Sequence, residues 1–162
     1  LYHLTEDTAQ VAAWMQELKE DGKYDASALL SALRENFWAA FADDAATEEE
    51  IRAVYERTGY TLDTHTAVAY CAAEAYRNET GDTRPMVVLS TASPYKFGAS
   101  VLHALGETAD GMDEFAQMER LHARSGMAIP ARLAALENVS VRHAGICEKD
   151  GMRAAVLDFV RA

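Results

Sequence analysis

The sequence predicts a helix-rich α/β fold with a partial parallel sheet. Through most of the 162 residues, apolar side chains recur at the three-to-four-residue spacing of amphipathic helices. One short run, Met86 to Leu89, is apolar throughout, as expected of a strand covered on both faces of a parallel sheet. A second strand is predicted at Asn138 to His143, where apolar and polar residues alternate. Two strands are too few to complete a doubly wound sheet, so we expect a piece of a longer chain.

The first part of the chain, residues 1 to about 60, is predicted to contain three helices. Thr5 and Asp25 can cap the first two, and Thr47 with Glu50 forms the capping-box pattern of the third. Each helix carries an apolar stripe at helical spacing. The three stripes are Val11, Trp14, Met15 and Leu18, then Leu29, Leu30, Leu33 and Phe37, then Ile51, Val54 and Tyr55.

The second part, about 61 to 162, is predicted to combine further helices with the two strands. The small-residue run from Ala67 to Ala73 predicts a tightly packed inner helix, because alanine lets another backbone approach closely. Pro94 suits a first helical turn, so a helix is expected directly after the first strand. We expect both parts to form one domain, 1–162. The remaining helices are predicted at Asp113 to Ala123, Ala131 to Leu136 and Met152 to Val160.

The composition is that of an acidic globular domain. Hydrophobic residues make up 49%, and 26 acidic residues against 15 basic ones give a net charge of -11. This charge repels phosphate backbones and anionic lipids, so we expect no nucleic-acid or membrane partner. Cys71 and Cys147 are isolated and are interpreted as free thiols of a reducing cytoplasm. Neither these cysteines nor the five histidines show metal-ligand spacing, so no metal site is predicted.

The turn from Ser90 to Ser93 is the first candidate for a binding site. In open α/β sheets, ligands bind just beyond the carboxyl ends of parallel strands, which is where this turn would lie. Its small side chains let a flat ligand approach the backbone, and its hydroxyl groups supply hydrogen bonds without charge. The alternative is an ordinary polar turn, in which Thr91 only caps the helix begun by Pro94.

Two further side chains are candidates for chemistry. Lys96 is a candidate amine nucleophile, although a solvated lysine is the usual finding early in a helix. His65 stands at a predicted helix start, where the helix dipole favours a neutral imidazole that can donate a hydrogen bond. A capping or core histidine is the alternative for His65.

Two segments resemble motifs of the threonine synthase family. Leu62 to Ala69, LDTHTAVA, is similar to the family's LDPHTAVA, with Thr64 in place of proline. Ser90 to Phe97, STASPYKF, is similar to STAHPAKF, with Ser93 in place of histidine. The connection from Glu50 to Tyr60 is also similar. The resemblance spans nearly the whole chain and corresponds to about the C-terminal third of the enzyme.

The resemblance implies a pyridoxal-phosphate enzyme with the tryptophan-synthase β-like fold. The family converts O-phosphohomoserine and water to threonine and phosphate. Its Schiff-base lysine and its phosphate-binding loop belong to earlier parts of the chain, so this segment alone is expected to be inactive, to carry no catalytic residue and to bind no cofactor. The alternative function is an acidic helical binding module without catalysis. None of the four lysines of this sequence stands in the family's lysine motif. They are Lys19, Lys23, Lys96 and Lys149.

The same resemblance assigns Thr91 to the pyridine nitrogen of the cofactor. A neutral hydroxyl group does not hold that nitrogen protonated as a carboxylate would, so it tunes how strongly the ring withdraws electrons. The residues predicted to form a wall of the active site are His65, Thr66, Ser90 and Ser93.

Overall fold

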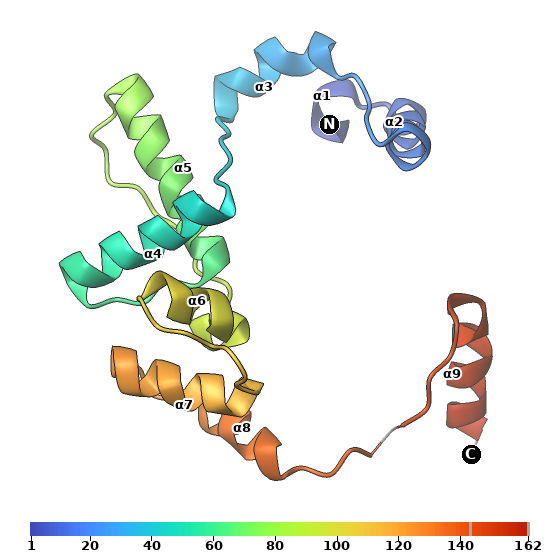
Figure 1. The fold of residues 1–162 in the computed structure, drawn as a ribbon. Helices are drawn as coiled ribbons and strands as arrows, with labels where there is room; N and C mark the ends of the chain where they lie inside the picture. The colour runs from blue at the N-terminus through green and yellow to red at the C-terminus, as the bar shows by residue number, and fades with distance from the viewer. Residues whose placement is uncertain (143, 162) are drawn as a thin grey trace.

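The structure, a computed structural model, describes residues 1–142 and 144–161. Its architecture is helix-rich, as predicted (Figure 1). The α-helices and the 3₁₀-helices (η) are α1 Tyr2–Thr5, α2 Thr8–Asp21, η1 Ser27–Leu29, α3 Leu30–Asn36, α4 Asp44–Thr58, α5 Thr64–Thr80, η2 Pro94–Phe97, α6 Gly98–Ala104, α7 Glu114–Ser125, α8 Ala131–Ala134, η3 Ala135–Asn138, η4 Lys149–Gly151 and α9 Met152–Arg161.

The hydrophobic core lies among α4, α5, α6 and α7. The side chains of Ile51, Leu102 and Leu121 are completely buried there, and Leu62 and Tyr95 join them from segments outside the α-helices. Burying one large aliphatic side chain stabilises a fold by about 1.5–3 kcal/mol. This helical body is therefore the stable part of the described chain, and both candidate motifs belong to it.

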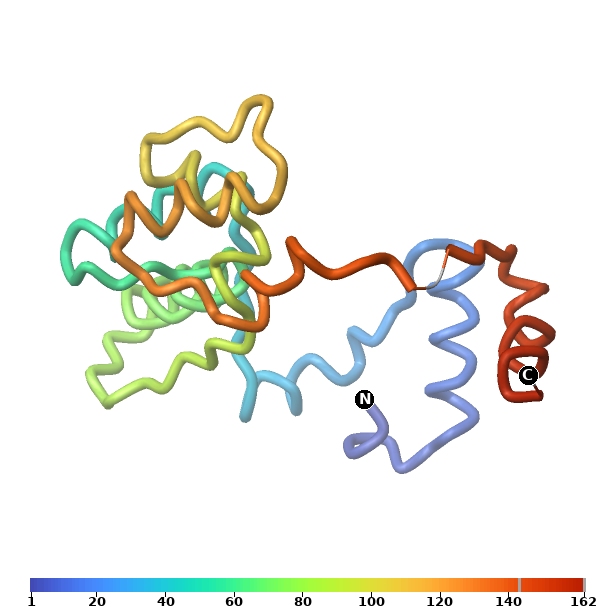
Figure 2. Tube along the Cα trace, turned by 90° about the horizontal axis from the view of Figure 1, so that it is seen from below, coloured from blue at the N-terminus to red at the C-terminus, as the bar shows by residue number. Residues whose placement is uncertain are grey.

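Two segments extend from this body, as Figures 1 and 2 show. Within the described residues, no member of the core cluster comes from residues 1–41 or 139–161. Residues 144–148 are irregular and lead through η4 into α9, whose apolar residues Val156 and Val160 are exposed. Among residues 1–142 and 144–161, no helix has both the length and the apolar character needed to cross a membrane.

Aspartates, rather than the predicted threonines, begin the first and third of the predicted helices. Asp7 caps α2 and Asp43 caps α4, each accepting a hydrogen bond from a backbone N–H of the first turn, at 2.9 and 2.8 Å. The predicted cap at Thr5 and the predicted capping box of Thr47 and Glu50 are therefore wrong. Thr47 lies inside α4, where its hydroxyl group donates to the Asp43 carbonyl at 2.7 Å. Either residue type can cap a helix, and the apolar spacing does not distinguish between neighbours.

The second predicted helix is confirmed but is shorter than expected. Asp25 accepts a hydrogen bond from the Ser27 N–H at 2.8 Å, where η1 begins and leads into α3. Helix α3 ends at Asn36, so Phe37 lies beyond it and its ring is exposed. The three helices predicted after residue 110 are confirmed as α7, α8 with η3, and α9.

Neither predicted strand is a β-strand in the described residues. Met86 to Leu89 is irregular chain, and residues 85–92 form no backbone hydrogen bond with any other described residue. The side chains of Val87 and Leu89 are left 85% and 75% exposed. The second predicted strand is irregular as well, over residues 139–142, and its His143 lies outside the described residues. A strand exists only where a neighbour pairs with its N–H and C=O groups, and the described chain supplies no neighbour.

Helix α5 is less enclosed than its alanines predicted. Only Thr66 and Ala67 are buried in α5, whereas residues 68–73 are half-buried or exposed. The helix packs on α4 along one face, and on the opposite face the ring of Tyr76 contacts Trp38, with the two ring centroids 5.6 Å apart. The predicted inner position is therefore wrong for this chain taken by itself.

The contact between α4 and α5 includes the Glu50 carboxyl group, and ionisation of this group weakens the contact. Burial, and then the negative charge of Glu74, raise the pKa of Glu50. The Cys71 thiol also lies 3.9 Å from the Glu50 carboxylate. The folded chain therefore favours protonated Glu50 more than the unfolded chain does. As the pH rises from the ordinary carboxyl pKa through the raised one, ionisation of Glu50 lowers the free energy of unfolding.

Glu50→Gln is therefore expected to stabilise the chain at pH 7. The rise in Tm should be about 1–2 °C, because a partly exposed charge contributes only a few tenths of a kcal/mol. The difference should disappear at pH 4, where Glu50 is largely protonated in both states. Thermal unfolding followed by circular dichroism at the two pH values measures this, with Glu49→Gln as the exposed control. A lower Tm for Glu50→Gln at pH 7 would contradict the explanation.

Candidate functional site

The first motif is organised by the buried carboxylate of Asp63, the N-cap of α5. Asp63 as a whole is only 1% exposed to solvent. One oxygen accepts the backbone N–H groups of His65 and Thr66, at 2.9 and 3.2 Å, and the other accepts the Thr66 hydroxyl group. These bonds and the positive end of α5 compensate the buried charge. Sequence analysis missed Asp63, although an aspartate directly before a helix start is a typical cap.

His65 is held at the exposed first turn of α5. Its Nδ1 atom lies 3.4 Å from the Thr64 hydroxyl group and 3.8 Å from the Asp63 carboxylate. Its ring centroid lies 4.9 Å from that of Phe97, with the two planes tilted by 43°. Phe97 is the last residue of the second motif, so the structure brings the two motifs into direct contact. The predicted helix start at His65 is confirmed.

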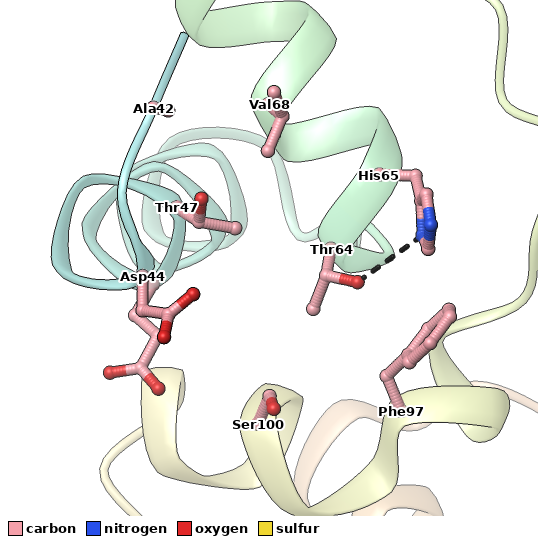
Figure 3. Close-up of a pocket in the computed structure, with 9 residues that line it drawn as sticks. Ala42, Asp44, Thr47, Thr64, His65, Val68, Phe97 and Ser100 are labelled. Carbon is pink, nitrogen blue, oxygen red and sulfur yellow. Dashed lines mark hydrogen bonds between the residues drawn. The ribbon is translucent and has the colours of Figure 1, made fainter. Parts of the chain in front are cut away.

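A pocket of about 350 Å³ lies beside this ring pair (Figure 3). Asp44 of α4 faces Thr64 of α5 across it (Figure 3), and Glu48 and His65 also line it. The Glu48 carboxylate also lies 2.7 Å from Nδ1 of His103, an ion pair only when that histidine is protonated. In the described part of the chain, no three His, Cys, Asp or Glu side chains are grouped so that they could hold a metal ion. The other residues that line the pocket are Ala42, Thr47, Val68, Phe97 and Ser100.

The second motif leaves Thr91 exposed and uses Ser93 as the helix cap. The Ser93 hydroxyl oxygen accepts a hydrogen bond from the Tyr95 N–H at 3.4 Å, where η2 begins. Thr91 forms no hydrogen bond with any other described residue. The alternative in which Thr91 serves as the cap is therefore wrong, and its hydroxyl group is available to a ligand.

A second pocket, of about 320 Å³, borders the same turn. Ser90 and Ala92 line it on either side of Thr91 in the sequence. Tyr95 anchors the following helix next to it, because its hydroxyl group donates to the Met127 carbonyl. Burial of the Tyr95 hydroxyl group raises its pKa. The remaining residues that line the pocket are Gly59, Tyr60, Thr61, Pro94, Ser125, Gly126 and Met127.

The predicted wall residues are divided between these two places. His65 lines the first pocket and Ser90 the second. Thr66 is buried, and its hydroxyl group is committed to Asp63, while Ser93 caps η2. Lys96 is exposed, with Nζ 5.4 Å from the centroid of its neighbouring Phe97 ring, as a solvated lysine would be.

Comparison with known proteins assigns this arrangement to a family. A family model described as "Threonine synthase, C-terminal" matches residues 66–150, more than half of the chain. The chain belongs to the threonine synthase family. It is 38% identical over 111 residues to threonine synthase of Escherichia coli, covering 68% of this chain and 24% of that protein. With threonine synthase of Saccharomyces cerevisiae it shares 35% identity over 98 residues, covering 57% of this chain and 19% of the yeast protein.

A solved threonine synthase has a similar structure. The crystal structure of the pyridoxal-phosphate-bound enzyme from Brucella melitensis aligns with a TM-score of 0.57 and 31% sequence identity. The alignment covers 83% of this chain and 25% of that one. The described helices therefore have the arrangement of part of a threonine synthase. The chain spans about a fifth to a quarter of the length of these relatives.

Asp63→Ala is expected to lower the free energy of unfolding by about 2–3 kcal/mol, because it removes a helix cap and leaves the Thr66 hydroxyl group without its buried partner. Urea denaturation followed by circular dichroism measures the loss. Asp63→Asn is the matched control, since asparagine caps helices about as well as aspartate. Its loss of unfolding free energy should be less than half of the loss in Asp63→Ala. Equal losses in both variants would show that the cap is not what stabilises this segment.

Proposed function

We propose that this chain is the C-terminal part of a threonine synthase, one domain of a longer enzyme. With the rest of that enzyme it would convert O-phosphohomoserine and water to threonine and phosphate, using pyridoxal phosphate. The observation that carries the proposal is the contact between the two motifs, with His65 on Phe97, within a chain whose residues 66–150 match the family's C-terminal domain.

The turn at Ser90–Ser93 fits one edge of the cofactor. Thr91 is exposed and its hydroxyl group is unpaired within the described residues, so it can reach a pyridine nitrogen. The neighbours Ser90 and Ala92 are small enough for a planar ring to lie close to the backbone. When bound, pyridoxal phosphate supplies an electron sink for the reacting amino acid.

The residues of this chain would orient and tune the cofactor rather than react. The Thr91 hydroxyl group would donate its proton in a hydrogen bond to the ring nitrogen and leave that nitrogen uncharged. Ser90 offers a polar group beside Thr91, whereas His65, Thr66 and Ser93 shape the backbone that carries the turn. None of the four lysines is assigned a catalytic role.

The missing sheet is also part of the proposal. Met86 to Leu89 would become a strand when strands from the rest of the enzyme pair with its free backbone groups and cover Val87 and Leu89. The exposure of these side chains supports this arrangement. Cys71 and Cys147 are free thiols, which is consistent with the proposed location in the cytoplasm.

The isolated 162-residue chain is expected to form no threonine from O-phosphohomoserine and to retain no covalently bound cofactor. A Schiff base requires a positioned, unprotonated amine, and Lys96 is solvated. Incubation with pyridoxal phosphate, borohydride reduction and peptide mapping test this. Stoichiometric labelling of Lys96 alone would contradict the proposal, whereas low, scattered labelling of all lysines is the expected background.

Thr91→Val in the full-length enzyme is expected to lower kcat about tenfold or more, because it leaves the ring nitrogen without its hydrogen-bond partner at a cost of about 1–3 kcal/mol. Steady-state kinetics and the absorption spectrum of the bound cofactor measure the effect. Thr91→Ser keeps the hydroxyl group and should retain most of the activity. Full turnover and an unchanged spectrum for Thr91→Val would remove Thr91 from the site.

A further inference from the structure

We infer that His65 is a positioning residue, which acts through Phe97 to fix the turn that carries Thr91. This inference rests on the proposed function for its effect on catalysis. Its structural part concerns only the described chain and can be tested without the reaction.

His65 is itself firmly placed, although 68% of its side chain is exposed. Its backbone N–H is bound by the buried Asp63 carboxylate at 2.9 Å, and its ring lies against the Thr64 hydroxyl group on the same turn. A ring held in this way presents a fixed surface at the end of α5. The surface contacts Phe97 with a centroid distance within the range of favourable aromatic pairs.

Phe97 stands at the junction between η2 and α6. Its backbone angles, φ −126° and ψ 43°, belong to neither helix, and no side chain caps α6 there. Val101 and Leu102 fix α6 in the core, so the direction of η2 depends on how the junction is held. Tyr95 anchors η2 to the Met127 carbonyl, and His65 supports it at Phe97.

The position of Thr91 follows from that of η2. The Ser93 side chain caps η2, and the Ser93 backbone carbonyl accepts the Lys96 N–H at 2.9 Å. Thr91 lies two residues before Ser93. Residues 85–92 have no backbone hydrogen bond of their own within the described chain. Because only Ala92 separates Thr91 from the Ser93 cap, a movement of η2 is passed to Thr91 even when Met86 to Leu89 are paired as a strand.

The pocket beside the ring pair explains why removing one ring would matter. It provides about 350 Å³ of space next to both His65 and Phe97. Without the imidazole, the Phe97 ring can turn into this space and draw the junction with it. The contact requires an aromatic ring but no particular proton, so phenylalanine should replace histidine here.

The test uses the full-length enzyme and its His65→Ala, His65→Phe and Phe97→Leu variants, with the double variant His65→Ala/Phe97→Leu. In enzyme freed of cofactor, amide hydrogen exchange of residues 88–97 should become about three- to tenfold faster in His65→Ala, and His65→Phe should recover at least half of this change. The control is His3→Ala, an exposed histidine of α1.

Kinetics of the loaded enzyme give the second measurement. We expect kcat of His65→Ala to fall about three- to tenfold with KM changed less than twofold, and the double variant to be no worse than the poorer single variant. Unchanged exchange in His65→Ala would overturn the inference, as would a kinetic loss in His65→Phe as large as that in His65→Ala. If the wild-type enzyme forms no threonine, the proposed function fails, and the exchange measurements still decide the role of His65.

Discussion

The Asp63 carboxylate is almost completely removed from water, and the hydrogen bonds that keep it there determine the geometry around it. Both backbone donors come from the first turn of α5, so the Asp63 side-chain oxygen that accepts them fixes where that helix starts. The start of α5 in turn places His65 at the surface and Thr66 in the interior. Breaking such a set of bonds leaves a buried charge without partners, which costs more than the bonds themselves contribute.

From this fixed point, the site is built outward by packing in the core and by a few specific contacts. The core holds α6, Tyr95 ties η2 to the residues after α7, and the ring pair of His65 and Phe97 joins the two motifs. The turn at Thr91 comes last and has no backbone hydrogen bonds with other described residues. The Thr91 hydroxyl group, which we propose for the cofactor, is thus supported by the helical body on one side only.

The sequence predicts most helices correctly, because apolar spacing reports directly which face a helix buries. It predicts their caps poorly where two capping residues stand close together, as with Asp43 and Thr47. Whether Met86 to Leu89 forms a strand could not be predicted from the sequence alone, because a strand requires a neighbouring strand that pairs with its backbone groups. The motifs could be found from the sequence, but not the contact of His65 with Phe97, since two residues far apart in the chain meet only after α5 and η2 are packed.

The unpaired run around Val87, Val88 and Leu89 has a consequence for producing the protein. It is an apolar, uncharged segment of high β-propensity, and in the described chain its backbone donors and acceptors are open. Identical copies of such a segment can pair with one another edge to edge, which is the first step of β-aggregation. If the rest of the proposed enzyme pairs with this segment, domain assembly and aggregation compete for the same backbone groups, and recombinant yield should depend on how soon the segment is covered.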